Sequence, residues 1–381
     1  MKLHCDISLP ASKSESNRAL MIAAYGGFAP DFQNISDSQD TKILAEALRK
    51  TQLGESTIDI ADCGTAARFM TTYLACHEGN WLMMGAGRMK RRPMAPLVDA
   101  LRTLGADIQY VEEQACLPLR IHGKPIQGGK VSIDMSRSSQ YASSLLLAAP
   151  MWPQGLELEL LGELSSLPYL DMTFNMLCRF SAQVERRDRT IVVKPKPYEK
   201  HPFTVESDWT AASYWYEMAA FSEECEIKLH GLSTCSRTEQ GDAIIAEWMK
   251  SFGVCTTPFE DGLVLTKKPY VKSQLSFDFT RYPDLYPTMA ATCAGLGVEA
   301  NFTGLDNLAF KESDRVVAMQ TELTKIGQQP LRFCAHNDHR IVMALAPLSM
   351  LFGEVGFDHP EVVKKSYSNF LDDASFLSIH G

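Results

Sequence analysis

The sequence has no apolar run long enough to span a bilayer. The longest run, 341–352, is too short and contains Pro347. The residues after Met1 lack the apolar stretch of a signal peptide. The ten cysteines include no Cys-x-x-Cys pair and no regular spacing, which argues against a disulfide framework and favours reduced thiols. We therefore expect a cytoplasmic globular protein.

The chain also lacks a basic excess, a low-complexity tract and a long linker. Its net charge of −9 argues against binding to nucleic acid or to a membrane surface. A local cluster of Lys and Arg could still line a cleft for an anionic small molecule. The 381 residues predict two or three domains, and any boundary must lie in a short crossover such as the proline-rich stretch 195–202.

What the chain does have is a cationic helix start near its N-terminus. Residues 10–20 read PASKSESNRAL and place Lys13, Ser14 and Arg18 in the first turns of a helix. Free N–H groups and the positive end of the helix dipole favour an anion there. Ser14 and Arg18 would point to the same side and could hold one phosphate from two directions. The alternative is an ordinary N-cap followed by a solvated turn.

Similar helix starts recur along the chain. They combine glycine, hydroxyl or amide groups with cations, at 62–68, 87–93, 136–140, 311–315, 336–340 and 364–370. Several such starts facing one cleft would hold ligands that carry several negative charges. For the 88–92 cluster, a solvated charged face is the alternative interpretation.

Four segments follow one plan, in which an amphipathic helix, a small residue and a strand-like stretch come in turn. The helices are expected at 97–104, 174–180, 244–252 and 317–326, and they end before Gly105, Ser181, Gly253 and Gly327. The near-constant spacing predicts an α/β chain of about six similar units. The alternative is that helices ending in glycine recur by chance.

Two further patterns are set aside. The stretch 123–130 looks like a phosphate-binding loop, but its spacing is one residue too long and Val131 stands where Ser or Thr must bind Mg²⁺. His336 and His339, with Asp338 between them, suggest metal ligands, but the adjacent Arg340 would oppose a cation. We therefore expect neither a nucleotide kinase nor a metal site.

At these positions the sequence resembles the 5-enolpyruvylshikimate-3-phosphate synthase family of enolpyruvyl transferases. The resemblance covers nearly the whole chain, and the motifs come in the family's order. They lie at 12–14, 17–19, 64–68, 88–93, 138–140, 168–169, 283–284, 311–315, 337–340 and 365–367. Each motif alone is weak, but the ordered set is specific.

The resemblance implies a two-domain α/β fold, an inside-out α/β barrel with three βαβαββ-type repeats in each domain. One domain would span 12–205 on the shikimate-phosphate side, and the other 1–11 plus 206–381. The active site would lie in the cleft between them. We expect the chain to act as a monomer.

The implied activity is that of a 3-phosphoshikimate 1-carboxyvinyltransferase, a transferase of the shikimate pathway to chorismate and the aromatic amino acids. The enolpyruvyl group of phosphoenolpyruvate passes to the 5-hydroxyl of shikimate 3-phosphate by addition and elimination, and phosphate is released. No metal or organic cofactor is implied. The implied partners are these two small molecules, without nucleic acid or a membrane.

The family's binding residues carry over onto matching positions of this sequence. The shikimate 3-phosphate set is Lys13, Ser14, Arg18, Ser138, Ser139, Gln140, Ser166, Asp284, Asn307 and Lys311. The phosphoenolpyruvate set is Lys13, Gly64, Arg88, Gln140, Arg315, Arg340 and Lys365. Arginine suits such sites because its planar fork meets a carboxylate or phosphate through two hydrogen bonds.

The implied catalytic residues are Asp284, Glu312, Lys13 and Lys365. Asp284 would accept the proton of the 5-hydroxyl, and Glu312, with help from Lys13 or Lys365, would protonate the methylene carbon. The alternatives are a turn aspartate after a proline and a glutamate that only pairs with its cationic neighbours. Cys63 departs from the family's pattern and would place a thiol near phosphoenolpyruvate, so that its alkylation would block activity.

Two other functions remain to be compared. The sister reaction on UDP-N-acetylglucosamine uses the same fold, but that family typically carries Cys or Asp in the loop that corresponds to 85–93, and neither occurs here. A non-catalytic anion-binding relative is the second alternative. The presence of Asp284, Glu312 and Lys365 argues against it.

Overall fold

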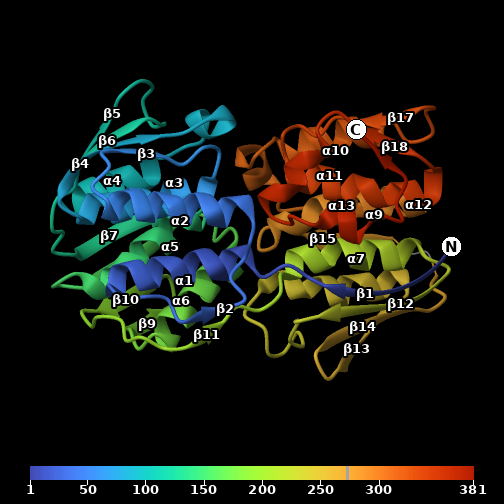
Figure 1. Ribbon diagram of the computed structural model, residues 1–381, viewed down its shortest axis with the longest axis horizontal. Coiled ribbons are helices and arrows are strands. Elements are labelled where there is room, and N and C mark those ends of the chain that lie inside the picture. Colours follow the sequence, from blue (N-terminus) through green and yellow to red (C-terminus); the bar gives the residue numbers. More distant parts are fainter. Residues whose placement is uncertain (272–273) are drawn as a thin grey trace. The chain divides into compact units, whose positions relative to one another are not determined.

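The computed structural model describes residues 1–271 and 274–381, and the chain divides into two compact units (Figure 1). Unit 1 comprises Met1–Ser12, Ser36–Gln39 and Glu206–Gly381, and unit 2 comprises Lys13–Ile35 and Asp40–Val205. The expected domain limits assigned Ser12 and residues 36–39 to the domain 12–205, whereas the structure places them in unit 1. Hydrogen bonds hold them there, because Ser12 N donates to Glu206 O at 2.8 Å and Ser368 Oγ donates to Asp37 O at 3.3 Å.

Unit 2 is built on three sheets within residues 13–205. Its strands are β2 (Phe32–Gln33), β3 (Thr57–Asp59), β4 (Gly79–Met84), β5 (Asp107–Tyr110), β6 (Leu119–Gly123), β7 (Gly129–Asp134), β8 (Leu156–Leu161), β9 (Gln183–Arg187), β10 (Thr190–Lys194) and β11 (Phe203–Thr204). The sheet orders are β3-β4-β6-β5, β7-β8-β10-β9 and β11-β2. Each four-stranded sheet pairs its first two strands in parallel and the others antiparallel.

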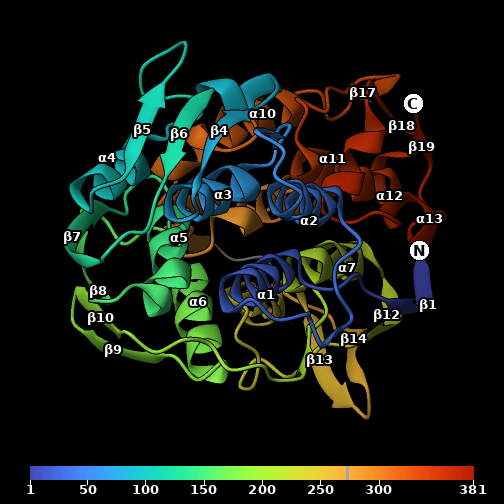
Figure 2. The same ribbon diagram turned by 60° about the vertical axis from the view of Figure 1, so that its left-hand side comes forward.

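The helices of unit 2 alternate between central and outer positions. They are α1 (Lys13–Gly26), α2 (Gln39–Gln52), α3 (Gly64–Cys76), α4 (Ala95–Thr103), α5 (Gln140–Ala148) and α6 (Leu167–Arg179), with 3-10 turns η1 (Gly87–Arg91) and η2 (Ala149–Met151). α1, α3 and α5 contact one another, and α3 and α5 are buried almost throughout. Their small and apolar residues allow this burial on all sides. Figure 2 shows the same helices from a second direction.

Unit 1 also contains three sheets among its described residues. Its strands are β1 (Lys2–Ser8), β12 (Glu224–His230), β13 (Val254–Phe259), β14 (Gly262–Lys267), β15 (Leu275–Asp278), β16 (Ala300–Thr303), β17 (Leu331–Phe333), β18 (Val355–Phe357) and β19 (Ile379–His380). The sheet orders are β1-β12-β14-β13, β15-β16 and β17-β18-β19. β1 and β12 pair in parallel, so that the chain of unit 2 forms part of the long connection that a parallel pair requires.

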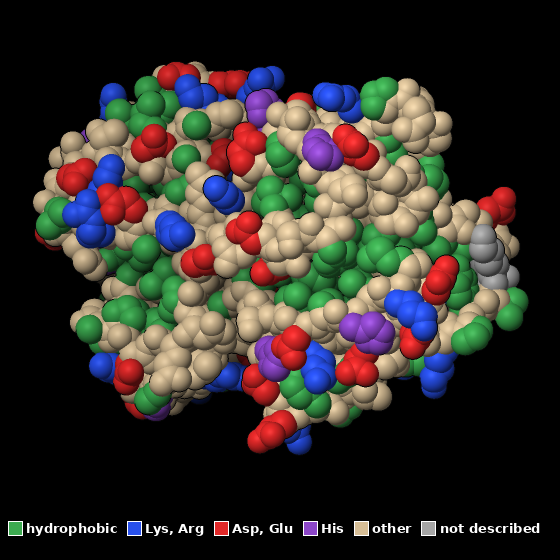
Figure 3. Space-filling model, turned by 45° about the vertical axis from the view of Figure 1, so that its right-hand side comes forward, with side chains coloured by type: hydrophobic (Ala, Val, Ile, Leu, Met, Phe, Trp, Pro, Cys, Tyr) green, Lys and Arg blue, Asp and Glu red, His purple; other side chains and the backbone are tan. Residues whose placement is uncertain are grey.

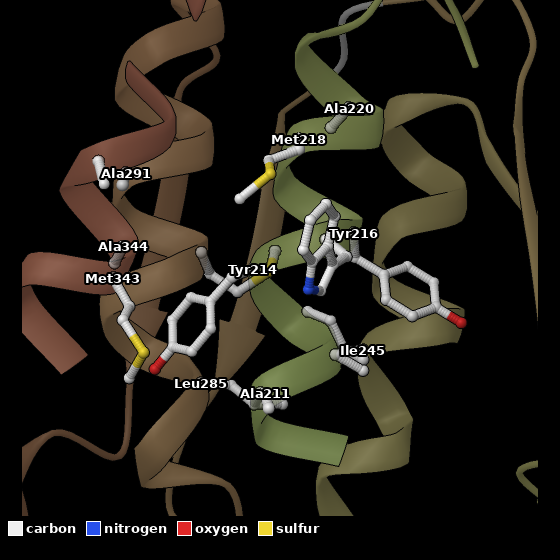
Figure 4. Close-up of a cluster of buried hydrophobic side chains, with 14 of the residues drawn as sticks. Ala211, Tyr214, Tyr216, Met218, Ala220, Ile245, Leu285, Ala291, Met343 and Ala344 are labelled. Carbon is white, nitrogen blue, oxygen red and sulfur yellow. The ribbon is translucent and has the colours of Figure 1, made fainter. Parts of the chain in front are cut away.

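The helices of unit 1 follow the same plan. They are α7 (Trp209–Phe221), α8 (Ile245–Trp248), α9 (Tyr286–Leu296), α10 (Arg315–Leu323), α11 (His339–Leu345), α12 (Ser349–Phe352) and α13 (Phe370–Asp373). The 3-10 turns are η3 (Gly241–Ile244), η4 (Met249–Phe252), η5 (Pro283–Leu285), η6 (Asp306–Phe310), η7 (Ala346–Leu348) and η8 (Pro360–Lys365). α7, α9 and α11 contact one another in the core, where Tyr214 and Tyr216 point to opposite sides of α7 (Figure 4).

The six expected units appear as six sheets, of which three are complete. β3 to β6 and β7 to β10 each follow a βαβαββ order with their helices, as do β1 and β12 to β14 once unit 2 is set aside. The other three sheets have two or three strands in the part of the chain that the structure describes. The repeat is therefore present, but half of its copies are reduced.

Helix boundaries differ from the expected ones. α4 and α6 begin at Ala95 and Leu167, before the expected residues, because Pro96 and Pro168 stand in their first turns, where proline is favourable. The helix expected at 244–252 is a succession of η3, α8 and η4.

The exterior agrees with the composition. None of the helices formed by residues 1–271 and 274–381 is long and apolar enough to cross a membrane. On the face shown in Figure 3, charged side chains of both signs are interspersed, without a block of one sign.

Candidate active site

The expected site residues of unit 2 gather where its central helices begin. Lys13 begins α1, Gly64 begins α3 and Gln140 begins α5. Gln140 Nε2 donates to Thr65 Oγ1 at 3.2 Å, so the starts of α3 and α5 lie together. Ser138 Oγ accepts from the backbone N–H of Gln140 at 3.2 Å. Positive ends of two helix dipoles therefore meet at this point, as an anion site requires.

Lys13 has a partner that the sequence analysis did not identify. Its Nζ lies 3.0 Å from Oδ2 of Asp40, at the start of α2, and the two side chains are 12% and 3% exposed. The thiol of Cys63, just before α3, donates to the Asp40 carbonyl at 3.7 Å. Asp40 thus connects the starts of α1 and α3. The sequence signal that could have identified Asp40 is an acidic residue in the first turn of a helix, where the helix dipole favours a negative charge.

Arg18 is buried inside unit 2. Its guanidinium donates to Thr173 Oγ1 at 2.7 Å and to the carbonyls of Ser14 and Tyr169 at 2.9 Å each. Burial lowers the pKa of Arg18 to about 10. These contacts occupy most of the N–H groups of a guanidinium. The binding of one phosphate by Ser14 and Arg18 together therefore stays a prediction. In this structure the Arg18 guanidinium contacts the Ser14 backbone.

The expectation of a reactive thiol at Cys63 is wrong. Its side chain has no exposed surface, and Sγ caps α3 by accepting from Ala66 N at 3.4 Å. The next residue, Gly64, lies against the guanidinium of Arg92. A Cβ at Gly64 would be 2.4 Å from Arg92 Nη1, so a larger residue here would displace the Arg92 guanidinium.

The 88–93 segment is supported by a second buried arginine. Arg68 donates to the carbonyls of Gly64 at 3.1 Å and Pro93 at 2.9 Å, and its guanidinium lies over the ring of Tyr141. It is 2% exposed, which indicates a supporting role. Arg88 is half-buried on η1 of this segment.

The remaining predicted serines of unit 2 precede its helices. Ser139 is buried before α5. Ser166 is buried before α6 in the left-handed conformation, with φ of +57°. Whether these serines bind the substrate stays a prediction.

In unit 1 the expected residues form a dense charge cluster around Arg315. This arginine is 1% exposed and begins α10. It donates to Asp284 Oδ1 at 2.7 Å, to Glu312 Oε2 at 2.8 Å and to Asp338 Oδ2 at 2.9 Å. Burial lowers the pKa of Arg315, but the three carboxylates outweigh burial and hold the pKa above its usual value.

Asp284 lies between two arginines. Its Oδ2 accepts from Arg340 Nη2 at 2.7 Å, its Oδ1 accepts from Arg315, and Lys311 Nζ lies 3.8 Å away. Burial raises the pKa of Asp284, but Arg340, Lys311 and Arg315 together hold it well below the usual value. The carboxylate is therefore ionised in this structure and neutralises cations that the sequence analysis assigned to a substrate.

Two buried aspartates complete the cluster and were not predicted as site residues. Asp338 has no exposed surface, caps α11, and accepts from Ser313 Oγ at 3.0 Å. Asp242 on η3 accepts from Thr210 Oγ1, and burial together with the charge of Asp284 raises its pKa. The motif around Asp338 was visible in the sequence, but its pairing with an arginine 23 residues earlier was not.

The other predicted residues of unit 1 occupy short turns. Asn307 is 3% exposed on η6, and Lys365 is 5% exposed on η8, which contacts α11. Among the residues that the structure describes, no group of three metal-ligating side chains could hold a metal ion. The cluster of unit 1 thus places three carboxylates, the ionised Asp284 among them, beside Arg315, Arg340 and Lys311. Such a set can bind an anion and accept a proton.

Comparisons with known proteins agree on one family. Residues 50–374 match the family model of EPSP synthase (3-phosphoshikimate 1-carboxyvinyltransferase). A 3-phosphoshikimate 1-carboxyvinyltransferase of Bacteroides fragilis strain YCH46 is 40% identical over 393 residues, covering 98% of this chain and 95% of that protein. The enzyme of the same name from Mannheimia haemolytica is 32% identical, with 98% and 96% covered.

The fold agrees as well. The structure of EPSP synthase from Acinetobacter baumannii superposes with a TM-score of 0.74 at 20% identity and covers 99% of this chain and 96% of that one. The expected α/β fold is thereby confirmed. On these matches, the chain belongs to the EPSP synthase family.

Proposed function

We propose that this chain transfers the enolpyruvyl group of phosphoenolpyruvate to the 5-hydroxyl of shikimate 3-phosphate and releases phosphate. The observation that carries the proposal is Asp284 between Arg315 and Arg340, at 2.7 Å from each. A base beside two arginines suits a reaction in which a hydroxyl loses its proton next to an anionic co-substrate. Family membership supplies the reaction itself.

The charges of the substrates explain the composition of both sets of residues. The two substrates bring two phosphates and two carboxylates. Unit 2 offers Lys13, Gln140 and the N-terminal ends of α3 and α5, and unit 1 offers Arg315, Arg340 and Lys311. Helix ends and guanidinium groups are the common means of binding such anions.

The base needs the substrate to become effective. In this structure Asp284 is a weak base because two arginines and a lysine lower its pKa. An anionic group of phosphoenolpyruvate would compete with Asp284 for Arg315 and Arg340. Sharing these cations raises the pKa of Asp284 toward the range that general-base catalysis needs. The proton of the 5-hydroxyl would therefore be accepted once both substrates are bound.

Glu312 is the proposed acid for the methylene carbon. Its carboxylate accepts from Arg315 Nη2 at 2.8 Å, so the same exchange of partners would release it to take up a proton from solvent, which it would then give to the methylene carbon. Lys13 and Lys365 would hold the departing phosphate, whose charge grows as the bond to carbon breaks. Glu312 would then take the proton back during elimination.

We also propose that the residues of both units act on the same pair of substrates, and that the chain acts as a monomer. Replacing Lys13 or Lys365 by Met should then abolish turnover equally, although the two lysines belong to different units. Gel filtration with light scattering tests the monomer.

Phosphate release is the direct test of the function. We expect release from phosphoenolpyruvate only when shikimate 3-phosphate is also present. UDP-N-acetylglucosamine in its place is the control, since it is the acceptor of the sister reaction. Release with that acceptor, or no release with either, contradicts the proposal.

A further inference from the structure

Glu322 of α10 is a buried carboxylate outside the proposed catalytic set. Its side chain is 1% exposed. Oε1 lies 2.8 Å from His336 Nε2, and Oε2 accepts from the backbone N–H of Cys334 at 2.8 Å and from Lys325. Burial raises the pKa of Glu322, but these hydrogen bonds lower it below its usual value. Glu322 is thus an ionised anchor for the loop that follows β17.

This loop adopts a conformation that side chains disfavour. His336 and Asn337 have φ of +52° and +53°, in the left-handed region. Two carboxylates from other segments hold the loop, because Asp358 Oδ1 accepts from Ala335 N at 2.7 Å and Glu322 Oε2 accepts from Cys334 N at 2.8 Å. Two consecutive left-handed residues persist only where their surroundings determine them.

The loop leads directly to the charge cluster. Asp338 follows the two left-handed residues and accepts from Arg315 Nε at 2.9 Å, and Arg340 donates to Asp284. α10 therefore holds the loop twice, through Arg315 in its first turn and Glu322 two turns later on the same face. The conformation of the loop fixes where Arg340 stands relative to Arg315.

We propose that Glu322 and His336 form a positioning pair, which holds the 334–338 loop so that Arg315 and Arg340 face one anionic group of phosphoenolpyruvate. This inference rests on the proposed function and deepens it. His336 acts through the loop and takes no part in proton transfer. The pair determines the affinity for phosphoenolpyruvate, because Arg340, the residue to which the loop leads, belongs to the phosphoenolpyruvate set and not to the shikimate 3-phosphate set.

Two variants separate the hydrogen bond from the backbone conformation. His336→Gly removes the imidazole but suits a positive φ, so a purely conformational role would survive. Glu322→Gln retains the shape of the side chain and removes its charge. His380→Gln is the matched control, since this histidine lies in the same unit, is 59% exposed and lies 3.4 Å from Glu354, away from the loop.

We expect both variants to raise the KM for phosphoenolpyruvate roughly tenfold, the effect of losing one charged hydrogen bond. The KM for shikimate 3-phosphate and the melting temperature should stay near those of the wild type, and the control should match the wild type in all three. Added imidazole should partly restore the KM of His336→Gly. An unchanged KM for phosphoenolpyruvate, or an equal rise in both KM values with a lower melting temperature, overturns the proposal.

Hydrogen exchange tests, independently of turnover, whether Glu322 and His336 hold the 334–338 loop. Amides of 334–340 should exchange faster in both variants and not in the His380→Gln control. Unchanged exchange of these amides in the two variants overturns the pairing. If the wild type releases no phosphate, the proposed function fails, and the exchange result still shows whether Glu322 holds the loop through His336.

Discussion

Arg315 Nη1 donates to Asp284 Oδ1 at 2.7 Å, and both side chains are nearly buried. Such a pair is costly to break from one side, because removal of one partner leaves an uncompensated buried charge. It is easily exchanged when another anion takes the place of the carboxylate. The same arginine would therefore pair with Asp284 in the free protein and with an anionic group of phosphoenolpyruvate in the proposed complex.

Replacing Asp284 by Asn should lower kcat by roughly 10²–10⁴, the usual contribution of a general base. The amide retains the size of the side chain but cannot accept the proton. Steady-state turnover with both substrates measures the effect. Asp278→Asn, at an exposed aspartate at the end of β15, is the control and should keep normal turnover. Near-normal turnover of the Asp284 variant would show that another group is the base.

The pH dependence should differ between kcat/KM and kcat. In the free enzyme, Arg340, Lys311 and Arg315 hold the pKa of Asp284 well below its usual value, so it stays ionised as the pH falls. In the substrate complex these cations are shared, and its pKa rises. Since kcat reports the complex and kcat/KM the free enzyme, the acid limb of kcat should lie at higher pH. Coincident acid limbs would contradict the exchange of partners.

Replacing Glu217 by Met should stabilise the protein. Glu217 lies inside the core on α7, and its carboxyl oxygens have no hydrogen-bond partner among the described residues. Removing an unsatisfied buried polar group gains about 1–3 kcal/mol. Thermal unfolding measures the gain, and Glu226→Met at an exposed position of β12 should show none.

The gain from Glu217→Met should also depend on pH. Burial raises the pKa of Glu217 well above its usual value, so the folded chain retains a proton that the unfolded chain releases above about pH 4.3. As the pH rises above that value, the free energy of unfolding of the wild type therefore falls relative to that of the variant. The difference in melting temperature should be larger at pH 8 than at pH 5.

Cys63 should resist alkylation in the folded protein. It has no exposed surface, whereas Cys178 and Cys235 are exposed. Peptide mapping after brief maleimide treatment should find the label on the two exposed residues, and Cys63 should react only after unfolding in urea. Phosphoenolpyruvate should not change this pattern. Rapid labelling of native Cys63 that phosphoenolpyruvate slows would restore the first expectation.

The sequence by itself determined the class of fold and most of the segments that carry the site. Helix starts with glycine, hydroxyl groups and cations are local patterns, and the regular spacing of helix ends reflects a repeat along the chain. For this reason the starts of α1, α3 and α5 were found without the structure. The reduced sheets, the broken helix before Gly253 and the earlier starts of α4 and α6 depart from that plan.

The tertiary structure decided which charges meet. Lys13 pairs with Asp40 and Arg315 with Asp338, over 27 and 23 residues of chain, and no local pattern specifies such pairs. Only the structure likewise showed that the Cys63 thiol is buried and caps a helix, which leaves it inaccessible to reagents. These outcomes depend on which side chains share a low-dielectric interior, because there an ionised group must find a partner or lose its charge.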